Sequence, residues 1–205
     1  QLGPEKLREK GIIQTIKKYN HQVYDLGNLY VESVDESEKF ASHSDMKYFK
    51  PLLDINTNLA HAVNTSLKTG YFPLIVGGDH SIALGSISGV SEYFDKKFAV
   101  VWFDAHGDIN TFETSESKNV HGMPLASLMG YGHSELKNLY TENIKISEDN
   151  VYHIGGRDID SGEKEFIQNT NMNMYYPEDI ANKGLDSIIS CILSSLHSKN
   201  IQAIH

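Results

Sequence analysis

The sequence predicts a parallel, doubly wound α/β sheet with helices on both faces. Apolar, strand-like runs alternate with helix-like segments along the chain, as in repeated strand–helix–strand units. Residues 98–103, FAVVWF, are apolar at every position, which is typical of a central strand covered on each side. Three apolar runs are followed directly by Asp and His clusters, and such sheets bind ligands beyond the carboxyl ends of their strands.

The individual elements follow from local patterns. Pro4 suits the first turn of a helix, Gly70 ends a helical stretch, and the polar and aromatic residues 30–50 lack a clear period and are expected to be loop. Helices are predicted at about 4–17, 52–68, 81–93, 163–169 and 185–198. Strands are predicted at 22–27, 74–78, 98–103, 151–156, 173–176 and 201–205.

Composition narrows the class of protein. The chain has 205 residues, no internal repeat and no long linker, so residues 1–205 are interpreted as one domain. Its net charge of −9 disfavours nucleic acid and anionic membranes as partners. The single cysteine, Cys191, excludes an intramolecular disulfide framework and is expected to be a buried thiol. No apolar run approaches ~18 residues and no signal peptide is recognised, so we expect a cytoplasmic protein.

The residues that follow the apolar runs predict a metal site. Asp104, His106 and Asp108 alternate in DAHGD, and alternate residues of an extended segment point the same way. His80, in GGDHS at 77–81, follows a neighbouring run and adds a further candidate ligand. Carboxylates with imidazole suit Mn²⁺, Fe²⁺, Co²⁺ or Zn²⁺. The alternative is that these residues only cap helices or turns, which is the role expected of Asp79.

A loop histidine is the candidate proton carrier. His121 lies in NVHGMP, at the end of a polar stretch without periodicity, and a long loop beside a cleft is a natural substrate-binding segment. Imidazole exchanges protons near neutral pH, so His121 is a candidate shuttle. The alternative is a solvent-exposed side chain without a chemical role.

The motifs GGDHS, DAHGDINT, NVHGMP and GRDID, in this order, resemble those of the ureohydrolases, and within them the arginases. The resemblance implies a three-layer α/β fold and two Mn²⁺ ions bridged by a hydroxide that attacks a guanidinium carbon. His80 and Asp108 match ligands of one metal, with Asp108 also orienting the hydroxide. His106 matches a ligand of the other metal, and Asp104 the bridging carboxylate. His121 matches the proton-shuttling histidine.

The resemblance also implies a substrate. Asn110, Ser117 and Asn119 match residues that bind an α-carboxylate, and Asp160, with Asp158 beside it, matches the residue that faces an α-amino group. Arginine carries both groups and agmatine lacks the carboxylate, so hydrolysis of L-arginine to L-ornithine and urea is expected. Lys118 departs from the family, which usually has glycine there.

The resemblance covers only part of the family's length. The family has a further strand before Gly3, and after His205 a D-x-D motif with two more ligands, so the sheet is expected to be incomplete at both ends and the metal site partial. The expected assembly is a homo-oligomer, by resemblance a trimer, acting on a small molecule. The alternatives are an agmatinase or other guanidino hydrolase, and an inactive fragment with partial metal binding.

Overall fold

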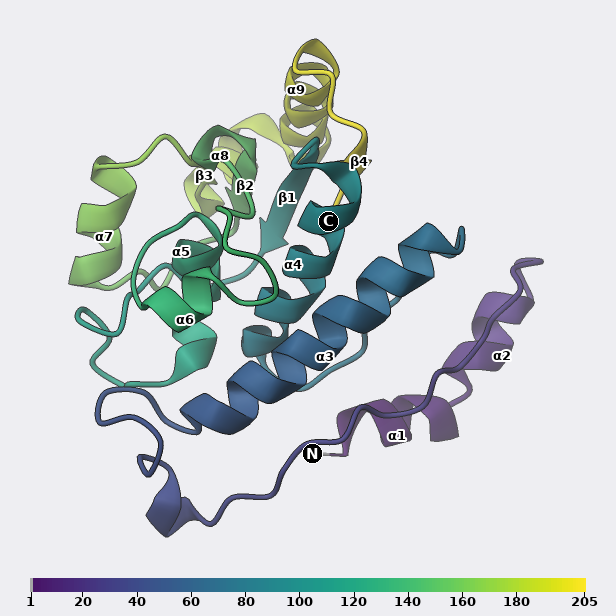
Figure 1. Ribbon diagram of the computed structural model, residues 1–205. Helices are drawn as coiled ribbons and strands as arrows, with labels where there is room; N and C mark the ends of the chain where they lie inside the picture. Colours follow the sequence, from purple (N-terminus) through teal and green to yellow (C-terminus); the bar gives the residue numbers. More distant parts are fainter. Residues whose placement is uncertain (1) are drawn as a thin grey trace.

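The computed structural model, which describes residues 2–205, contains a four-stranded parallel sheet between layers of helices (Figure 1). The strands are β1 (Phe98–Phe103), β2 (Val151–Ile154), β3 (Asn173–Tyr175) and β4 (Ala203–Ile204), in the order β3-β2-β1-β4. The chain therefore adds β2 and β3 on one side of β1 and then returns to place β4 on the other. This reversal makes the sheet doubly wound and directs attention to the carboxyl end of β1.

The helices account for most of the remaining structure. The α-helices are α1 (Gly3–Glu9), α2 (Ile12–Lys17), α3 (Phe49–Lys68), α4 (Ala83–Phe94), α5 (Pro124–Leu128), α6 (Ser134–Lys137), α7 (Ser161–Gln168), α8 (Pro177–Lys183) and α9 (Leu185–Ser198). Short 3-10 helices are η1 (Glu36–Glu38), η2 (His80–Ile82), η3 (Val120–Gly122) and η4 (Glu148–Asn150). In the described part of the chain, no helix combines the length and apolar character needed to cross a bilayer.

Strand β1 shows why its sequence is apolar throughout. Phe98, Val100 and Trp102 belong to the core formed with α3, α4 and α5. Ala99 and Val101 belong to a second core on the opposite face, where α9 contributes Ile188, Ile192 and Leu196. Successive side chains of a strand point to opposite faces, so a strand that is covered on both faces favours apolar residues at all its positions. The predicted three-layer parallel fold is confirmed.

Helices α3 and α4 approach very closely beside the sheet. A Cβ atom at Gly85 would lie 2.4 Å from the carbonyl oxygen of Asn56, and one at Gly89 would lie 2.5 Å from that of Ala60. The Asn56 side chain accepts a hydrogen bond from the Gly85 amide at 2.8 Å. This contact fixes the start of α4, and with it η2, which carries His80.

Several predictions from local pattern are wrong. The helix predicted over 4–17 is two helices, because Gly11 adopts a left-handed φ of 82° between them. Residues 22–27 and 74–78 form no strand in the described chain, and Gly27 adopts a left-handed φ of 77°. Helices α5, α6 and α8 were not predicted. Cys191 is exposed, because it lies on the face of α9 away from the sheet.

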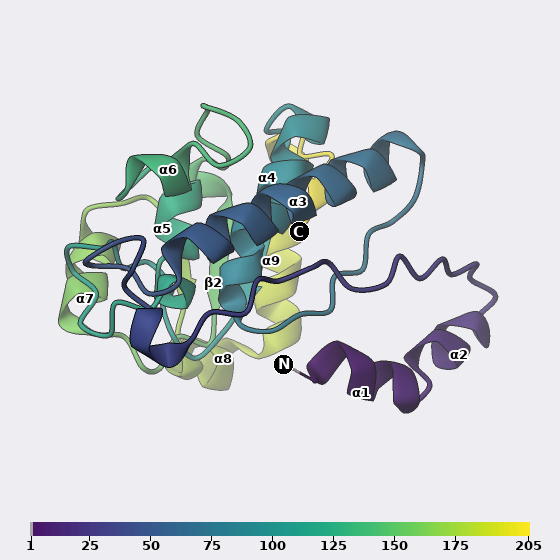
Figure 2. The same ribbon diagram turned by 60° about the horizontal axis from the view of Figure 1, so that its bottom comes forward.

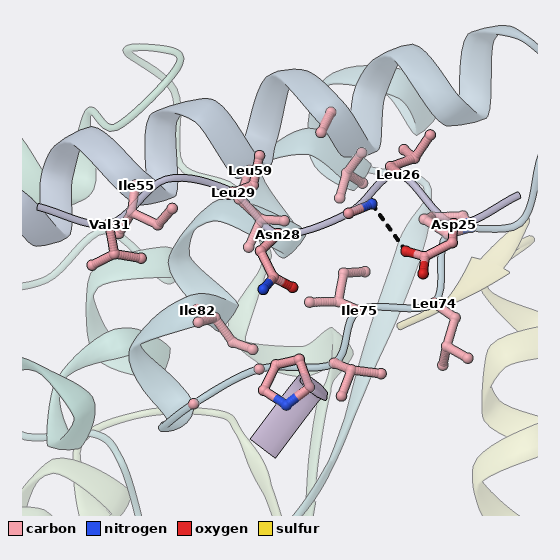
Figure 3. Close-up of a pocket in the computed structure, with 18 of the residues that line it drawn as sticks. Asp25, Leu26, Asn28, Leu29, Val31, Ile55, Leu59, Leu74, Ile75 and Ile82 are labelled. Atoms are coloured by element: carbon pink, nitrogen blue, oxygen red, sulfur yellow. Dashed lines mark hydrogen bonds between the residues drawn. The ribbon is translucent and has the colours of Figure 1, made fainter. Parts of the chain in front are cut away.

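Residues 22–27 and 74–78 line a large, mainly apolar cavity. Helices α1 and α2 stand apart from the body of the molecule (Figure 2). The cavity, with a volume of about 2020 Å³, lies between these two helices with residues 21–34 on one side and α3 with residues 71–79 on the other. Figure 3 shows apolar side chains from both sides lining it, among them Leu26, Leu29, Leu59, Leu74 and Ile75. Apolar runs alone predicted strands here, but a strand also requires a hydrogen-bonded neighbour.

Candidate metal centre

Three ligand-type side chains meet at the carboxyl end of β1. The Nδ1 atom of His80 lies 2.7 Å from Asp104 Oδ2 and 2.8 Å from Asp108 Oδ2. All three ligand atoms lie within 4.8 Å of one another. They line a small open cavity of about 210 Å³, whose full lining is Asp79, His80, Asp104, His106, Asp108 and His121. The structure thus gathers residues from three separate motifs.

The backbone of each element sets these positions. Asp104 directly follows β1, and its Oδ1 accepts the His106 amide at 2.9 Å, which folds the following turn. Asp108 is 5% exposed and adopts a left-handed φ of 54°, while its carbonyl accepts the Leu125 amide at 3.0 Å. The His80 ring packs on Trp102, with centroids 4.1 Å apart. The cluster is therefore held by the sheet, by η2 and by α5.

The electrostatics favour a cation between these groups. The hydrogen bond from His80 to Asp108 raises the pKa of His80, and the charges of Asp108 and Asp104 add to this effect against the cost of burial. Burial opposes ionisation of Asp104, but the His106 amide and the charges of His80 and His106 lower its pKa overall. Carboxylates that hold a proton on a neighbouring imidazole also attract a divalent metal.

His106 lies on the outer side of the same carboxylate. Its Nδ1 is 3.3 Å from Asp104 Oδ1, whereas His80 approaches Asp104 Oδ2. The His106 side chain is 63% exposed, and its Nε2 lies 3.6 Å from Asp158. Its carbonyl accepts a hydrogen bond from the buried His153 ring at 2.7 Å. The two oxygens of Asp104 thus face two different imidazoles, an arrangement suited to a carboxylate that bridges two metals.

His121 reaches the edge of this cluster from η3. Its Nδ1 lies 3.5 Å from Asp79 Oδ2, and both side chains are about half exposed. Asp79 also accepts the Ser81 amide at 3.1 Å, so it caps η2 as predicted. The loop histidine therefore lies against the acidic cap of the neighbouring motif and is not isolated in solvent.

The residues expected to bind the substrate divide into two groups. Asn110 Nδ2 donates to Asp160 Oδ2 at 2.7 Å, although the two residues are fifty positions apart. Asn119 donates its amide to the Ser117 hydroxyl at 3.2 Å, on the loop that leads to His121. Asp158 is 82% exposed and contacts His106. The structure thus joins Asn110 to Asp160 and places Asp158 beside His106.

One residue was missed by the sequence interpretation. Glu163 is 4% exposed and its carboxylate accepts the amides of Asp160 at 3.2 Å and Ile109 at 3.4 Å. Burial raises its pKa, and the charges of Asp160 and Asp108 add to this effect, while the hydrogen bonds from the amides of Asp160 and Ile109 oppose it. Glu163 ties the loop of Asp108 to the start of α7. The capping pattern D-x-x-E at 160–163 was the available signal.

Comparisons with known proteins agree with this geometry. A sequence model of a protein family, described as "Arginase family", matches residues 1–205. An arginase of Staphylococcus aureus (strain COL) is 37% identical over 204 residues, which is 100% of this chain and 67% of that protein. The crystal structure of an arginase from Bacillus cereus matches with a TM-score of 0.90 at 35% identity, covering 100% of this chain and 66% of that one.

A further match holds a small molecule. The crystal structure of Entamoeba histolytica arginase in complex with L-ornithine has a TM-score of 0.81 at 28% identity, with 100% of this chain and 67% of that chain covered. The chain spans about two thirds of the length of the proteins it matches.

Proposed function

Because the chain belongs to the arginase family, we propose that residues 1–205 lie in one ureohydrolase domain of a binuclear manganese enzyme that converts L-arginine to L-ornithine and urea. The observation that carries this proposal is the position of Asp104, whose two oxygens face His80 and His106 separately. The carboxylate of Asp108 lies close to the same nitrogen of His80, Nδ1. The family match supports a hydrolase, and this geometry supports the proposal that it holds a metal centre.

The donor set fits Mn²⁺. His80 and Asp108 would hold one ion, His106 would hold the second, and Asp104 would span both. Two carboxylates and two imidazoles supply the mixed oxygen and nitrogen ligands that this metal accepts. When bound there, the metal would supply a water of lowered pKa as the nucleophile.

The protein's own residues would orient the reaction and move its proton. Asp108 is buried and held by Leu125, so its carboxylate can orient the attacking water. Pairing of His121 Nδ1 with Asp79 favours the tautomer that keeps Nε2 free. His121 would first accept at Nε2 the proton that the attacking water gives up, and would then pass it to the leaving amine as the C–N bond breaks and the guanidinium carbon becomes the carbon of urea.

The substrate's α-carbon groups would meet the opposite side of the site. Asn110, Ser117 and Asn119 offer neutral donors for a carboxylate, and Asp160 offers a carboxylate for an ammonium, with Asp158 nearby. Asn110 and Asp160 already form a hydrogen bond, so the two kinds of contact lie side by side. The ornithine bound in the Entamoeba histolytica arginase supports this substrate class.

The test is urea release from L-arginine and from agmatine by the whole protein with Mn²⁺ added. We expect release from arginine and little from agmatine. A preference for agmatine would contradict the substrate assignment, and absence of both hydrolysis and Mn²⁺-dependent stabilisation would contradict the enzyme assignment. A cytoplasmic location and a homo-oligomer, by resemblance a trimer, belong to the same proposal, and sedimentation measures the assembly.

A further inference from the structure

We propose that Lys118 is a positioning residue whose ammonium clamps the substrate loop, residues 110–119, onto residues 43–47. The inference rests on the proposed function, in which Ser117 and Asn119 bind the substrate carboxylate. Lys118 lies between these two residues, so its conformation determines where both side chains are presented.

The backbone at Lys118 adopts a conformation that needs outside support. Its φ of 58° lies in the left-handed region, which side chains with a Cβ atom disfavour. Its amide donates to the buried hydroxyl of Ser115 at 3.0 Å, and its carbonyl accepts the Lys47 amide at 3.0 Å. The second bond joins the loop to a segment that is distant in sequence.

The side chain of Lys118 strengthens the same connection. Its Nζ donates to the carbonyl of Phe112 at 2.9 Å and lies 3.5 Å from Asp45 Oδ1. Only 29% of the side chain is exposed. The bond to Phe112 closes the loop on itself, and the approach to Asp45 ties the closed loop to residues 43–47. A hydrogen bond from a charged donor is stronger than one between neutral groups.

Aromatic packing holds the two segments in contact at the same place. The ring of His43 lies 6.2 Å from that of Phe112 and 5.1 Å from that of Phe49. His133 packs edge-on against His43 at 4.9 Å and against Phe112 at 5.5 Å. Phe112 thus contributes its ring to this cluster and its carbonyl to Lys118. The ammonium is committed to these contacts, so it acts through the loop and not as a free charge.

The experiment compares Lys118→Met, which removes the charged donor, with Lys118→Gly, which also removes the backbone strain. Lys68→Met, at an exposed position near the end of α3, is the matched control. Amide hydrogen exchange of residues 115–119 is measured without metal. We expect exchange to accelerate at least about tenfold in both Lys118 variants, equivalent to about 1.4 kcal/mol, and to stay unchanged in the control.

Kinetics with the whole Mn²⁺-loaded protein give the second readout. Lys118→Met should raise KM for arginine about fivefold, while kcat changes by less than about twofold, because loop order affects binding of the carboxylate. If KM rises while hydrogen exchange stays unchanged, the Lys118 charge contacts the substrate directly and the clamp is refuted. If neither KM nor hydrogen exchange changes, Lys118 has no role in substrate binding. If the unmodified protein releases no urea, the proposed function fails, whereas hydrogen exchange still decides the clamp.

Discussion

Gly107 separates two of the candidate metal ligands, and replacing it by alanine is expected to destabilise the protein and weaken its metal site. A Cβ atom there would lie 2.7 Å from both Cδ and Oε1 of Glu163, well inside the 3.4 Å at which ordinary contact begins. The φ of Gly107 is outside the left-handed region, so the obstacle is steric alone. The glutamate would have to retreat from the amides of Ile109 and Asp160.

The size of the effect follows from these contacts. Overpacking a buried site costs about 1–3 kcal/mol. Two weakened hydrogen bonds add about 0.5–1.5 kcal/mol each. We therefore expect Gly107→Ala to lower the free energy of unfolding by about 3 kcal/mol, which at about 2–4 °C per kcal/mol for this size lowers Tm by about 6–12 °C. Because Gly107 lies between His106 and Asp108, stabilisation by Mn²⁺ should also decrease.

The assay is thermal unfolding with and without Mn²⁺, combined with a double-mutant cycle. Gly122→Ala is the control, because nothing lies within 4 Å of its added Cβ. Glu163→Asp withdraws the carboxylate by one methylene, so the double variant should be at least about 1 kcal/mol more stable than the sum of the single changes. A Gly107→Ala protein within about 0.5 kcal/mol of the original, or strictly additive changes, would refute the steric reasoning.

Three further predictions concern the metal centre and a buried lysine. Asp104→Asn should lower kcat for arginine at least about 100-fold and reduce bound manganese measured by elemental analysis; full activity would contradict the bridging role. Mn²⁺ should change the fluorescence of Trp102, the single tryptophan, because its ring contacts His80. The substitution Asp108→Asn should abolish this change. If Mn²⁺ does not alter the fluorescence of the unmodified protein, the metal site does not include His80. Lys145 is 1% exposed and donates to three carbonyl oxygens, and burial, with the nearby charge of Lys96, lowers its pKa from 10.5 to about 8. The unfolded chain holds this proton to higher pH. As the pH increases from about 8 to 10.5, the free energy of unfolding measured by urea titration should therefore rise relative to that of Lys145→Met, by at most about 3.4 kcal/mol. A difference that stays constant with pH would refute the assignment.

The candidate site was predictable to the extent that its ligands are close in sequence. Asp104, His106 and Asp108 follow a strand whose apolar pattern is unambiguous, so both the strand and the cluster after it are found from the residues alone. The position of His80 was expected from a strand at 74–78 that the described chain does not form; it is set instead by η2, at the start of α4. The D-x-x-E pattern marked Glu163 as a helix-capping residue, but no local pattern indicated its burial or its contact with Gly107.

Prediction from the sequence fails where the structure of a residue depends on a neighbour that is distant along the chain. Residues 22–27 and 74–78 have strand-like composition, but a strand forms only where another strand offers its backbone, and the described chain offers none there. Cys191 lies among apolar residues in the sequence and is exposed in the structure, because helix periodicity turns it away from the sheet. Local composition predicts neither the missing strand pairing nor the exposure of Cys191.

The central strand at 98–103, the general alternation of helices and strands, and the polar residues at the strand ends could be predicted from the residues alone, since each depends on a few adjacent positions. Three contacts became visible only in the folded chain: Asn110 meets Asp160, Asp104 faces two imidazoles with different oxygens, and Lys118 reaches Asp45. These contacts depend on the packing of whole elements, and that packing arises from the burial of apolar surface across the entire chain.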